Sequence, residues 1–367
     1  MITVTKPFLP PLEEFLPYLE QIWKNKQLTN NGPFHKQLEA ELAEYLGVKY
    51  ISLFANATLG LVTALQALGI SGEVITTPFS FVATSHALWW NKITPVFVDV
   101  EPAYLNLDPE KIEAAITPRT TAIMPVHVYG NPCNVDEIKR IADRHGLKVI
   151  YDAAHAFGVK KDGVSVLNHG DLSVVSFHAT KVYSTIEGGA VICHTPEMKH
   201  HLDNLKNFGF RDETTVEEPG INAKLNEVQA AYGLLQLKYV DRLIDRRRSI
   251  ARLYRSLLAD VPGFYLIPDI VRVTQGFAYF PVLIKEEKYG ISRDALYAKL
   301  KEKNIYARRY FYPLISVFEP YCKLPSARAE NLPNATTAAE RVLCLPIYPD
   351  LEDTEVQFIC SVIKDPA

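Results

Sequence analysis

The chain has 367 residues, of which 48% are hydrophobic and 22% are charged. These values are ordinary for a globular protein and exclude a disordered, coiled-coil or collagen-like chain. The 39 lysines and arginines nearly balance the 42 acidic residues, so the net charge of −3 gives no general attraction to nucleic acid or to an anionic membrane. A chain of this length predicts two domains with a large buried core.

The cysteines and the N-terminus indicate the compartment. Five cysteines stand far apart and form no CxxC pair, so we expect neither a disulfide framework nor a metal site. The first residues contain prolines and acids where a signal peptide has an apolar core. No apolar run approaches the ~20 residues that span a bilayer. The expectation is a soluble, cytoplasmic protein.

Short β-branched runs alternate with amphipathic stretches over the first 235 residues or so. This alternation is typical of a mostly parallel sheet that helices cover on both faces. The strand-like runs lie at 50–54, 73–77, 95–99, 121–126, 148–152 and 172–177, and helical patterns between them include 109–115 and 135–145.

The pattern changes at Leu225, from which apolar residues at helical spacing predict a long amphipathic helix, broken once, up to about Asp260. Arginines 246–248 are interpreted as its solvent-exposed face. We expect a large domain of residues 1–235, with an N-terminal arm, and a smaller α+β domain of residues 236–367. The smaller domain is predicted to contain strands at 277–284 and 342–347 and helices at 292–303 and 353–363.

The first of four segments that suggest chemistry is SVVSFHATK at 173–181, followed by EGGAV at 187–191. An apolar strand ends at Ser176, and Lys181 lies in a polar turn just beyond it, where open α/β sheets bind ligands. A lysine held away from bulk water there can have a lowered pKa and form a Schiff base. The alternative is a surface lysine in a hairpin loop.

The other three segments also follow predicted strands. Asp152 ends a buried strand, where a carboxylate needs a cationic partner such as a pyridinium nitrogen, or else caps the next turn. At 52–61 a polar turn leads into a helix whose free N–H groups could bind a phosphate, with Asn56 or Thr58 as the alternative N-cap. Phe81 could stack on a flat ring or belong to the core.

A Schiff-base lysine, a pyridinium-pairing aspartate, a phosphate-binding turn and a stacking aromatic are what pyridoxal 5'-phosphate (PLP) requires of a protein. With the loops at 27–33, 126–132, 220–225 and 308–313, these motifs resemble the DegT/DnrJ/StrS family of PLP-dependent sugar aminotransferases over nearly the whole chain. The resemblance implies the aspartate aminotransferase-like type I fold, an α/β fold with a mostly parallel sheet in the large domain.

The same resemblance implies roles for single residues. Lys181 would form the Schiff base and transfer protons, Asp152 would pair with the pyridinium nitrogen, and Phe81 would stack on the ring. His155 stands near the PLP hydroxyl, where many members have glutamine.

The phosphate would be held by the backbone at Ala57 and Thr58 and by the hydroxyls of Thr58 and Ser176. Asn222 would reach it from the partner subunit of a homodimer with shared active sites. The chain departs from many members in having Asn56-Ala57-Thr58 where they have Ser-Gly-Thr, and Ile186 where glycine is frequent.

The implied reaction is a ping-pong transfer from L-glutamate, with pyridoxamine phosphate as the intermediate cofactor form. The lysine motif and DAAHAFG at 152–158 resemble members that aminate C4 of dTDP-4-keto-6-deoxy-D-glucose for O-antigen or other surface glycans. The alternative is C3 amination of a dTDP-3-keto-6-deoxyhexose. Candidates for contacts with this dTDP-sugar, or else for interdomain packing, are Thr29, Asn30, Arg308 and Tyr310. His127 is either a core histidine or a ligand contact.

Overall fold

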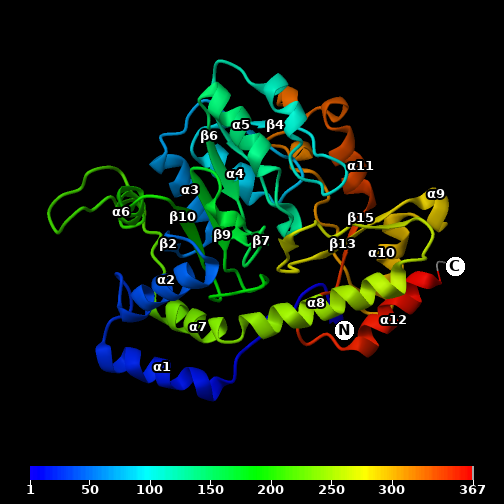
Figure 1. The fold of residues 1–367 in the computed structure, drawn as a ribbon, viewed down its shortest axis with the longest axis horizontal. Helices are drawn as coiled ribbons and strands as arrows, with labels where there is room; N and C mark the ends of the chain where they lie inside the picture. The colour runs from blue at the N-terminus through cyan, green and yellow to red at the C-terminus, as the bar shows by residue number, and fades with distance from the viewer. Residues whose placement is uncertain (366–367) are drawn as a thin grey trace.

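A seven-stranded sheet forms the centre of the larger part of the molecule in the computed structural model, which describes residues 1–365 (Figure 1). Its strands lie in the order β2-β10-β9-β6-β5-β3-β4, and β10 is antiparallel to both of its neighbours. The expected α/β class with a mostly parallel sheet is confirmed. The strands are β2 (Tyr50–Phe54), β3 (Glu73–Thr76), β4 (Thr94–Phe97), β5 (Thr120–Met124), β6 (Lys148–Asp152), β9 (Leu172–Ser176) and β10 (Gly189–Cys193).

Helices cover both faces of this sheet, because successive strand residues enter different hydrophobic cores. Val174 of β9 packs in one core with residues of α3, α4 and α6, whereas Val175 packs on the other face with residues of α2 and α7. Strands buried on both faces have continuous apolar sequences, which is why they were predictable. The helices are α2 (Pro33–Leu46), α3 (Ala57–Ala67), α4 (Ala83–Trp90), α5 (Val135–His145), α6 (Pro196–Leu205) and α7 (Glu227–Leu237).

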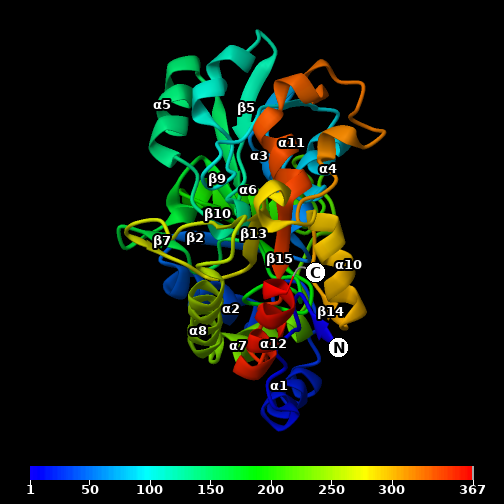
Figure 2. The same cartoon turned by 90° about the vertical axis from the view of Figure 1, so that its right-hand side faces the viewer.

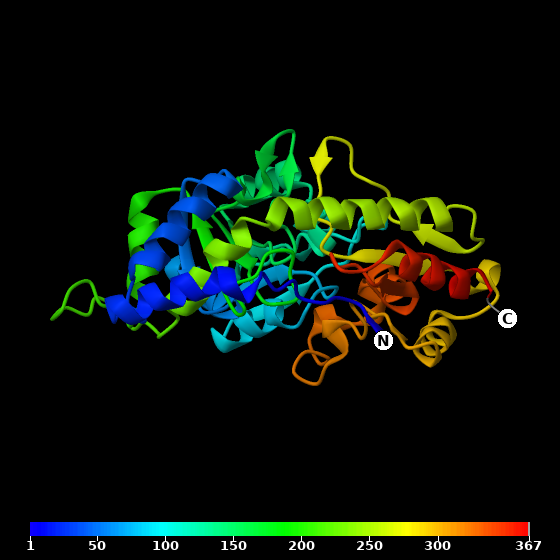
Figure 3. The ribbon, with the colours of Figure 1, turned by 90° about the horizontal axis from the view of Figure 1, so that it is seen from below.

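The C-terminal part packs a three-stranded antiparallel sheet against α8, α10 and α12 in one core (Figure 2). The predicted long helix with one break is confirmed, since α7 is followed after two residues by α8, which runs from the large sheet to the C-terminal part (Figure 3). The elements are β11 (Phe264–Leu266), β13 (Phe280–Ile284), β15 (Val342–Leu345), α8 (Val240–Leu258), α10 (Arg293–Glu302) and α12 (Asp353–Lys364).

The N-terminal strand joins this C-terminal part, because β1 (Ile2–Thr3) pairs in parallel with β14 (Ile305–Tyr306). The division at residue 235 stays a prediction. Among the described helices, none combines the length and the hydropathy of a membrane span. The remaining elements are α1 (Leu12–Asn25), α9 (Glu286–Tyr289), α11 (Pro333–Arg341), β7 (Lys160–Lys161), β8 (Val164–Ser165) and β12 (Val273–Thr274).

Two expectations need correction. The helical pattern at 109–115 forms two short 3-10 turns, because so few residues seldom sustain an α-helix. Arg246 and Arg248 form surface ion pairs, but Arg247 is 2% exposed and donates to the carbonyl of Ile347 at 2.9 Å. Three successive helical residues span about 200° of the helix surface, so they cannot all face solvent on a helix that packs on one side.

Candidate active site

The carboxyl ends of β2, β3, β5, β6 and β9 lie at the same edge of the sheet, because these strands run in one direction. Open α/β sheets bind their ligands at this edge. A cavity of about 290 Å³ lies there. It collects seven of the eight predicted cofactor-binding residues, together with Tyr310 from the C-terminal part; the seven are Ala57, Thr58, Phe81, Asp152, His155, Ser176 and Lys181.

Lys181 reaches the cavity from the loop after β9. Its Nζ donates to the Tyr279 hydroxyl at 3.3 Å and lies 5.7 Å from the centroid of that ring. Burial lowers the pKa of Lys181 to about 8, and the nearby charge of Asp152 opposes this effect. At pH 7 about a tenth of the amine is therefore uncharged and able to attack a carbonyl carbon. A partly buried lysine in a cavity excludes the surface-lysine alternative.

Asp152 ends β6 and is 5% exposed. One oxygen, Oδ1, accepts from the N–H of Ala154 at 3.1 Å, and Oδ2 accepts from the Thr84 hydroxyl at 2.7 Å. Burial raises the pKa of Asp152, whereas these two hydrogen bonds and the charge of Lys181 lower it. The carboxylate thus caps the following turn with one oxygen and still lines the cavity, and its described hydrogen-bond donors are both uncharged.

Asn56 is the N-cap of α3, as one of the alternatives predicted, because its Oδ1 accepts from the N–H of Leu59 at 2.9 Å. That bond leaves the N–H groups of Ala57 and Thr58 at the helix start for an anion. Gly189 lets β10 begin against this turn, since an added Cβ would lie 2.6 Å from the nitrogen of Ala57. The absence of a side chain at Gly189 thus lets β10 approach the turn that we expect to bind the phosphate.

Phe81 lines the cavity and is 59% exposed, whereas Phe79, two residues earlier, is fully buried. Phe79 therefore belongs to the core, whereas Phe81 does not and is free to stack on a ligand. His155 is 4% exposed, and burial lowers its pKa well below the usual value, so its ring is neutral. The backbone N–H of Tyr129 donates to Nδ1 of His155 at 3.3 Å, which assigns the proton to Nε2.

Sequence reasoning missed several residues of the cavity. Tyr279 and Phe311 come from the C-terminal part and carry no pattern that separates them from core aromatics. Thr84, at the start of α4, contacts Asp152 without lining the cavity, and its sequence position does not distinguish it from other helix residues. Ser80 directly precedes Phe81, but nothing in the sequence assigns a role to its hydroxyl.

Other predicted residues lie away from this cavity in the same chain. Thr29 is in an exposed loop, and Asn30 lines a different cavity of about 230 Å³ that also contains Lys206. Arg308 is exposed, and its backbone pairs with Cys344. Their substrate contacts stay predictions. His127 is fully buried with its ring stacked on Tyr151, 4.7 Å between centroids, as the core alternative for it predicts.

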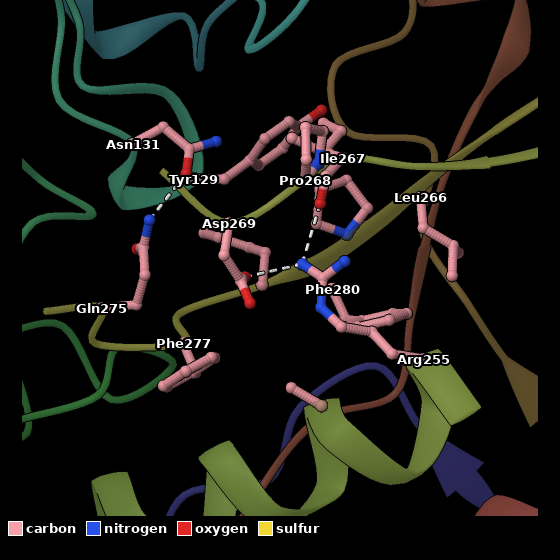
Figure 4. A pocket seen from close by; sticks show the side chains of 13 residues that line it. Tyr129, Asn131, Arg255, Leu266, Ile267, Pro268, Asp269, Gln275, Phe277 and Phe280 are labelled. Atoms are coloured by element: carbon pink, nitrogen blue, oxygen red, sulfur yellow. Dashed lines mark hydrogen bonds and ion pairs between the residues drawn. The ribbon is translucent and has the colours of Figure 1, made fainter. Parts of the chain in front are cut away.

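Figure 4 shows a smaller cavity of about 40 Å³. Tyr279 lines both this cavity and the first one. Beside the smaller cavity, Arg255 of α8 donates to the Asp269 carboxylate at 2.9 Å and to the carbonyl of Ile267 at 2.8 Å. Gln275 donates to the side chain of Asn131 at 2.9 Å. These bonds fasten the segment that leads to Tyr279 both to α8 and to the loop after β5.

The DegT/DnrJ/EryC1/StrS aminotransferase family matches residues 12–364. This chain belongs to that family. It is 54% identical over 364 residues to a dTDP-4-amino-4,6-dideoxy-D-glucose transaminase of Shigella dysenteriae, covering 99% of this chain and 98% of that protein. It is 53% identical over 367 residues to the Escherichia coli protein of the same name, with the same coverage.

Two solved structures show the same fold. DesI, in the presence of its TDP-sugar product, matches with a TM-score of 0.94 and 37% identity, covering 99% of this chain and 92% of that chain. Helicobacter pylori PseC, an aminotransferase involved in pseudoaminic acid biosynthesis, matches with a TM-score of 0.92 and 28% identity over 100% and 98% of the two chains. The expected family, enzyme class and fold are confirmed.

The aminotransferases of this family depend on PLP, and the residues of the cavity fit that cofactor. Asp152 is a buried carboxylate with uncharged hydrogen-bond donors, which suits a pyridinium N–H. The start of α3 leaves two N–H groups for a phosphate, and Phe81 is exposed to the cavity. Lys181 has the lowered pKa that formation of a Schiff base requires.

Proposed function

We propose that this protein is a PLP-dependent aminotransferase that moves the amino group of L-glutamate to C4 of dTDP-4-keto-6-deoxy-D-glucose, giving dTDP-4-amino-4,6-dideoxy-D-glucose. One observation carries the chemistry: Lys181, Asp152, Phe81 and the start of α3 converge on one cavity at the carboxyl edge of the sheet. The choice of sugar rests on the names of the relatives that are 54% and 53% identical.

Each residue of the cavity has a distinct task in this proposal. PLP supplies an aldehyde for a Schiff base and a ring that accepts electrons. Lys181 would bind that aldehyde and, when its amine is free, would move a proton. Asp152 would hold the proton of the ring nitrogen, and Phe81 would cover one face of the ring. The neutral ring of His155 has Nε2 available to donate to the ring hydroxyl.

The phosphate would be bound without a lysine or arginine of the same chain, because Lys181 is the only such residue among those that line the cavity in the described part of the chain. The N–H groups of Ala57 and Thr58 and the hydroxyls of Thr58 and Ser176 provide donors. We propose that Asn222 of the partner subunit adds another in a homodimer. The segment between Asn207 and Asn222 follows α6, and a bridge between these two residues closes its base. This segment extends away from the large sheet (Figures 1 and 3).

The shared site can be tested by complementation. Lys181→Ala and Asn222→Ala, each expressed alone, are expected to have little activity. Co-expressed, they form mixed dimers in which one of the two sites has both Lys181 and Asn222. Random mixing therefore recovers about a quarter of wild-type activity per subunit. Recovery no greater than the sum of the separate variants would refute the role of Asn222 across the interface.

The reaction itself is tested by NMR of the product formed from PLP-loaded protein, L-glutamate and dTDP-4-keto-6-deoxy-D-glucose. We expect an equatorial amine at C4, and no product with Lys181→Ala. An axial amine would keep the chemistry and change the product. Absence of amination would refute this acceptor, and the 3-keto isomer would be tested next, with an amine at C3 as the alternative outcome. Use of the product for O-antigen or another surface glycan, and a cytoplasmic location, are further parts of the proposal.

A further inference from the structure

Two buried hydroxyls form a chain that ends on Asp152. The Ser80 Oγ lies 2.9 Å from Thr84 Oγ1, which lies 2.7 Å from Asp152 Oδ2. Ser80 is 4% exposed and Thr84 is fully buried. An ionised carboxylate can only accept, so Thr84 donates its single proton to Asp152, and Ser80 must then donate to Thr84. The direction of the chain therefore follows from the charge at its end.

This arrangement is specific to Thr84 and is not a general result of burying a hydroxyl. The next residue, Ser85, is equally buried on the same helix, yet its Oγ has no hydrogen-bond partner. Thr84 lies in the first turn of α4, and the preceding loop carries Ser80 from the end of β3 to the cavity. The helix start thus brings one particular hydroxyl to the carboxylate at the end of β6.

We propose that Ser80 and Thr84 are positioning residues that keep the Asp152 carboxylate ionised and oriented for the ring nitrogen of the cofactor. This inference rests on the proposed function. Asp152 has two described hydrogen-bond donors, Thr84 and the N–H of Ala154. Because burial favours the protonated acid, loss of the Thr84 hydroxyl leaves one hydrogen bond and the charge of Lys181 to oppose that effect.

A protonated Asp152 could not stabilise a positive ring nitrogen, so the hydroxyl chain would control the cofactor through the charge state of this carboxyl. A hydrogen bond to a charged group is strong enough that its loss should raise the pKa of Asp152 by about one to two units. Loss of Ser80 removes only the donor behind Thr84, and we expect a smaller rise of about half a unit.

The chain offers a matched set of variants. Thr84→Val keeps the shape and removes the hydroxyl, Thr84→Ser restores a hydroxyl at the same carbon, and Ser85→Ala removes a buried hydroxyl without a partner. The first readout uses the apoprotein, in which the Asp152 carboxyl is titrated by carbon-13 NMR and assigned with Asp152→Asn. We expect the upward shift in Thr84→Val, a value near wild type in Thr84→Ser, and no change in Ser85→Ala.

The second readout is the pH dependence of kcat in the PLP-loaded enzyme, whose acidic limb should move upward in Thr84→Val by the same amount. A purely structural role would lower activity at all pH values without moving this limb. If Thr84→Val does not fold, the smaller shift in Ser80→Ala is measured instead. An unchanged Asp152 midpoint in whichever variant folds would overturn the inference.

A negative result of the titration can be distinguished from a negative result of the product experiment. The titration needs neither substrate nor cofactor, so an unchanged midpoint in an enzyme that still makes the C4 amine would refute only the hydroxyl chain. A shifted midpoint in a protein that does not aminate the sugar would support the chain and refute the proposed acceptor.

Discussion

Replacing Asp152 by asparagine should make Lys181 more reactive in the apoprotein, although it removes a residue that the cofactor needs. Burial lowers the pKa of Lys181 from 10.5 to about 8, and the negative charge of Asp152 works in the opposite direction. An amide has nearly the same shape and no charge. The pKa of Lys181 should therefore fall below 8 in Asp152→Asn, by about one unit.

The magnitude follows from the uncharged fraction of the amine. At pH 7 a lysine with a pKa of 10.5 has about 0.03% of its amine uncharged, and burial to a pKa near 8 raises this to about 10%. A further fall of about one unit gives about 50% and a labelling rate about five times higher. The ratio of the two labelling rates therefore rises toward about ten below pH 7 and approaches one above about pH 9, where the Lys181 amine is mostly uncharged in both proteins.

Competitive labelling with acetic anhydride measures this directly. Apoprotein is labelled between pH 5 and 10, and the Lys181 peptide is quantified by mass spectrometry against exposed lysines of the same digest. Asp143→Asn, which removes an exposed acid that pairs with Lys139 on the surface, is the control and should leave the Lys181 midpoint unchanged. A wild-type midpoint above about 10, or an upward shift in Asp152→Asn, would refute the reasoning.

Three further changes have defined outcomes. Burial opposes ionisation of Glu39, but its hydrogen bond to His35 and the charges of Lys206 and Lys199 hold its pKa at about 2 instead of 4.5. The Glu39 carboxylate therefore stabilises the fold above pH 4.5, and this stabilisation is lost as the pH falls toward 2. Glu39→Gln should lower the free energy of unfolding at pH 7 by about 3 kcal/mol and flatten its pH dependence below pH 5, in urea titrations. Gly189→Ala should weaken PLP retention on dialysis, because its Cβ meets backbone at the phosphate-binding turn. Ile186→Gly should raise the free energy of unfolding by about 1 kcal/mol, because Ile186 has a φ of 72° that a β-branched residue rarely adopts. An Ile186→Ala variant that is as stable as Ile186→Gly would show that backbone strain is not the cause.

The residues that sequence predicted best are those whose positions the sheet dictates. Asp152 and Ser176 end two neighbouring parallel strands, β6 and β9, so the motifs that follow must meet. Phe81 and the start of α3 follow β3 and β2, whose carboxyl ends lie at the same edge. No comparable rule relates Lys181 to Tyr279, which is 98 residues away in sequence and directly precedes β13 of the other sheet.

The wrong prediction for Arg247 has the same cause, which is a contact with a residue far away in the sequence. A run of three basic residues on a helix suggests a solvent-exposed face. Arg247 instead is buried where α8 packs on the C-terminal part, and it donates a hydrogen bond to the carbonyl of Ile347 there. The acceptor is 100 residues away in sequence and is a backbone atom. The local sequence around Arg247 therefore cannot predict the hydrogen bond that determines where its side chain lies.

The position of Tyr279 makes the geometry at Lys181 depend on both parts of the molecule. The lysine is fixed by the loop after β9, whereas the phenol precedes β13 and is held through Arg255 of α8 and Gln275 (Figure 4). A hydrogen bond of 3.3 Å weakens steeply when its atoms move apart by even a fraction of an ångström. Any displacement of α8 against the large sheet therefore changes the surroundings of the amine, while Asp152 and the start of α3 move with the sheet and keep their places.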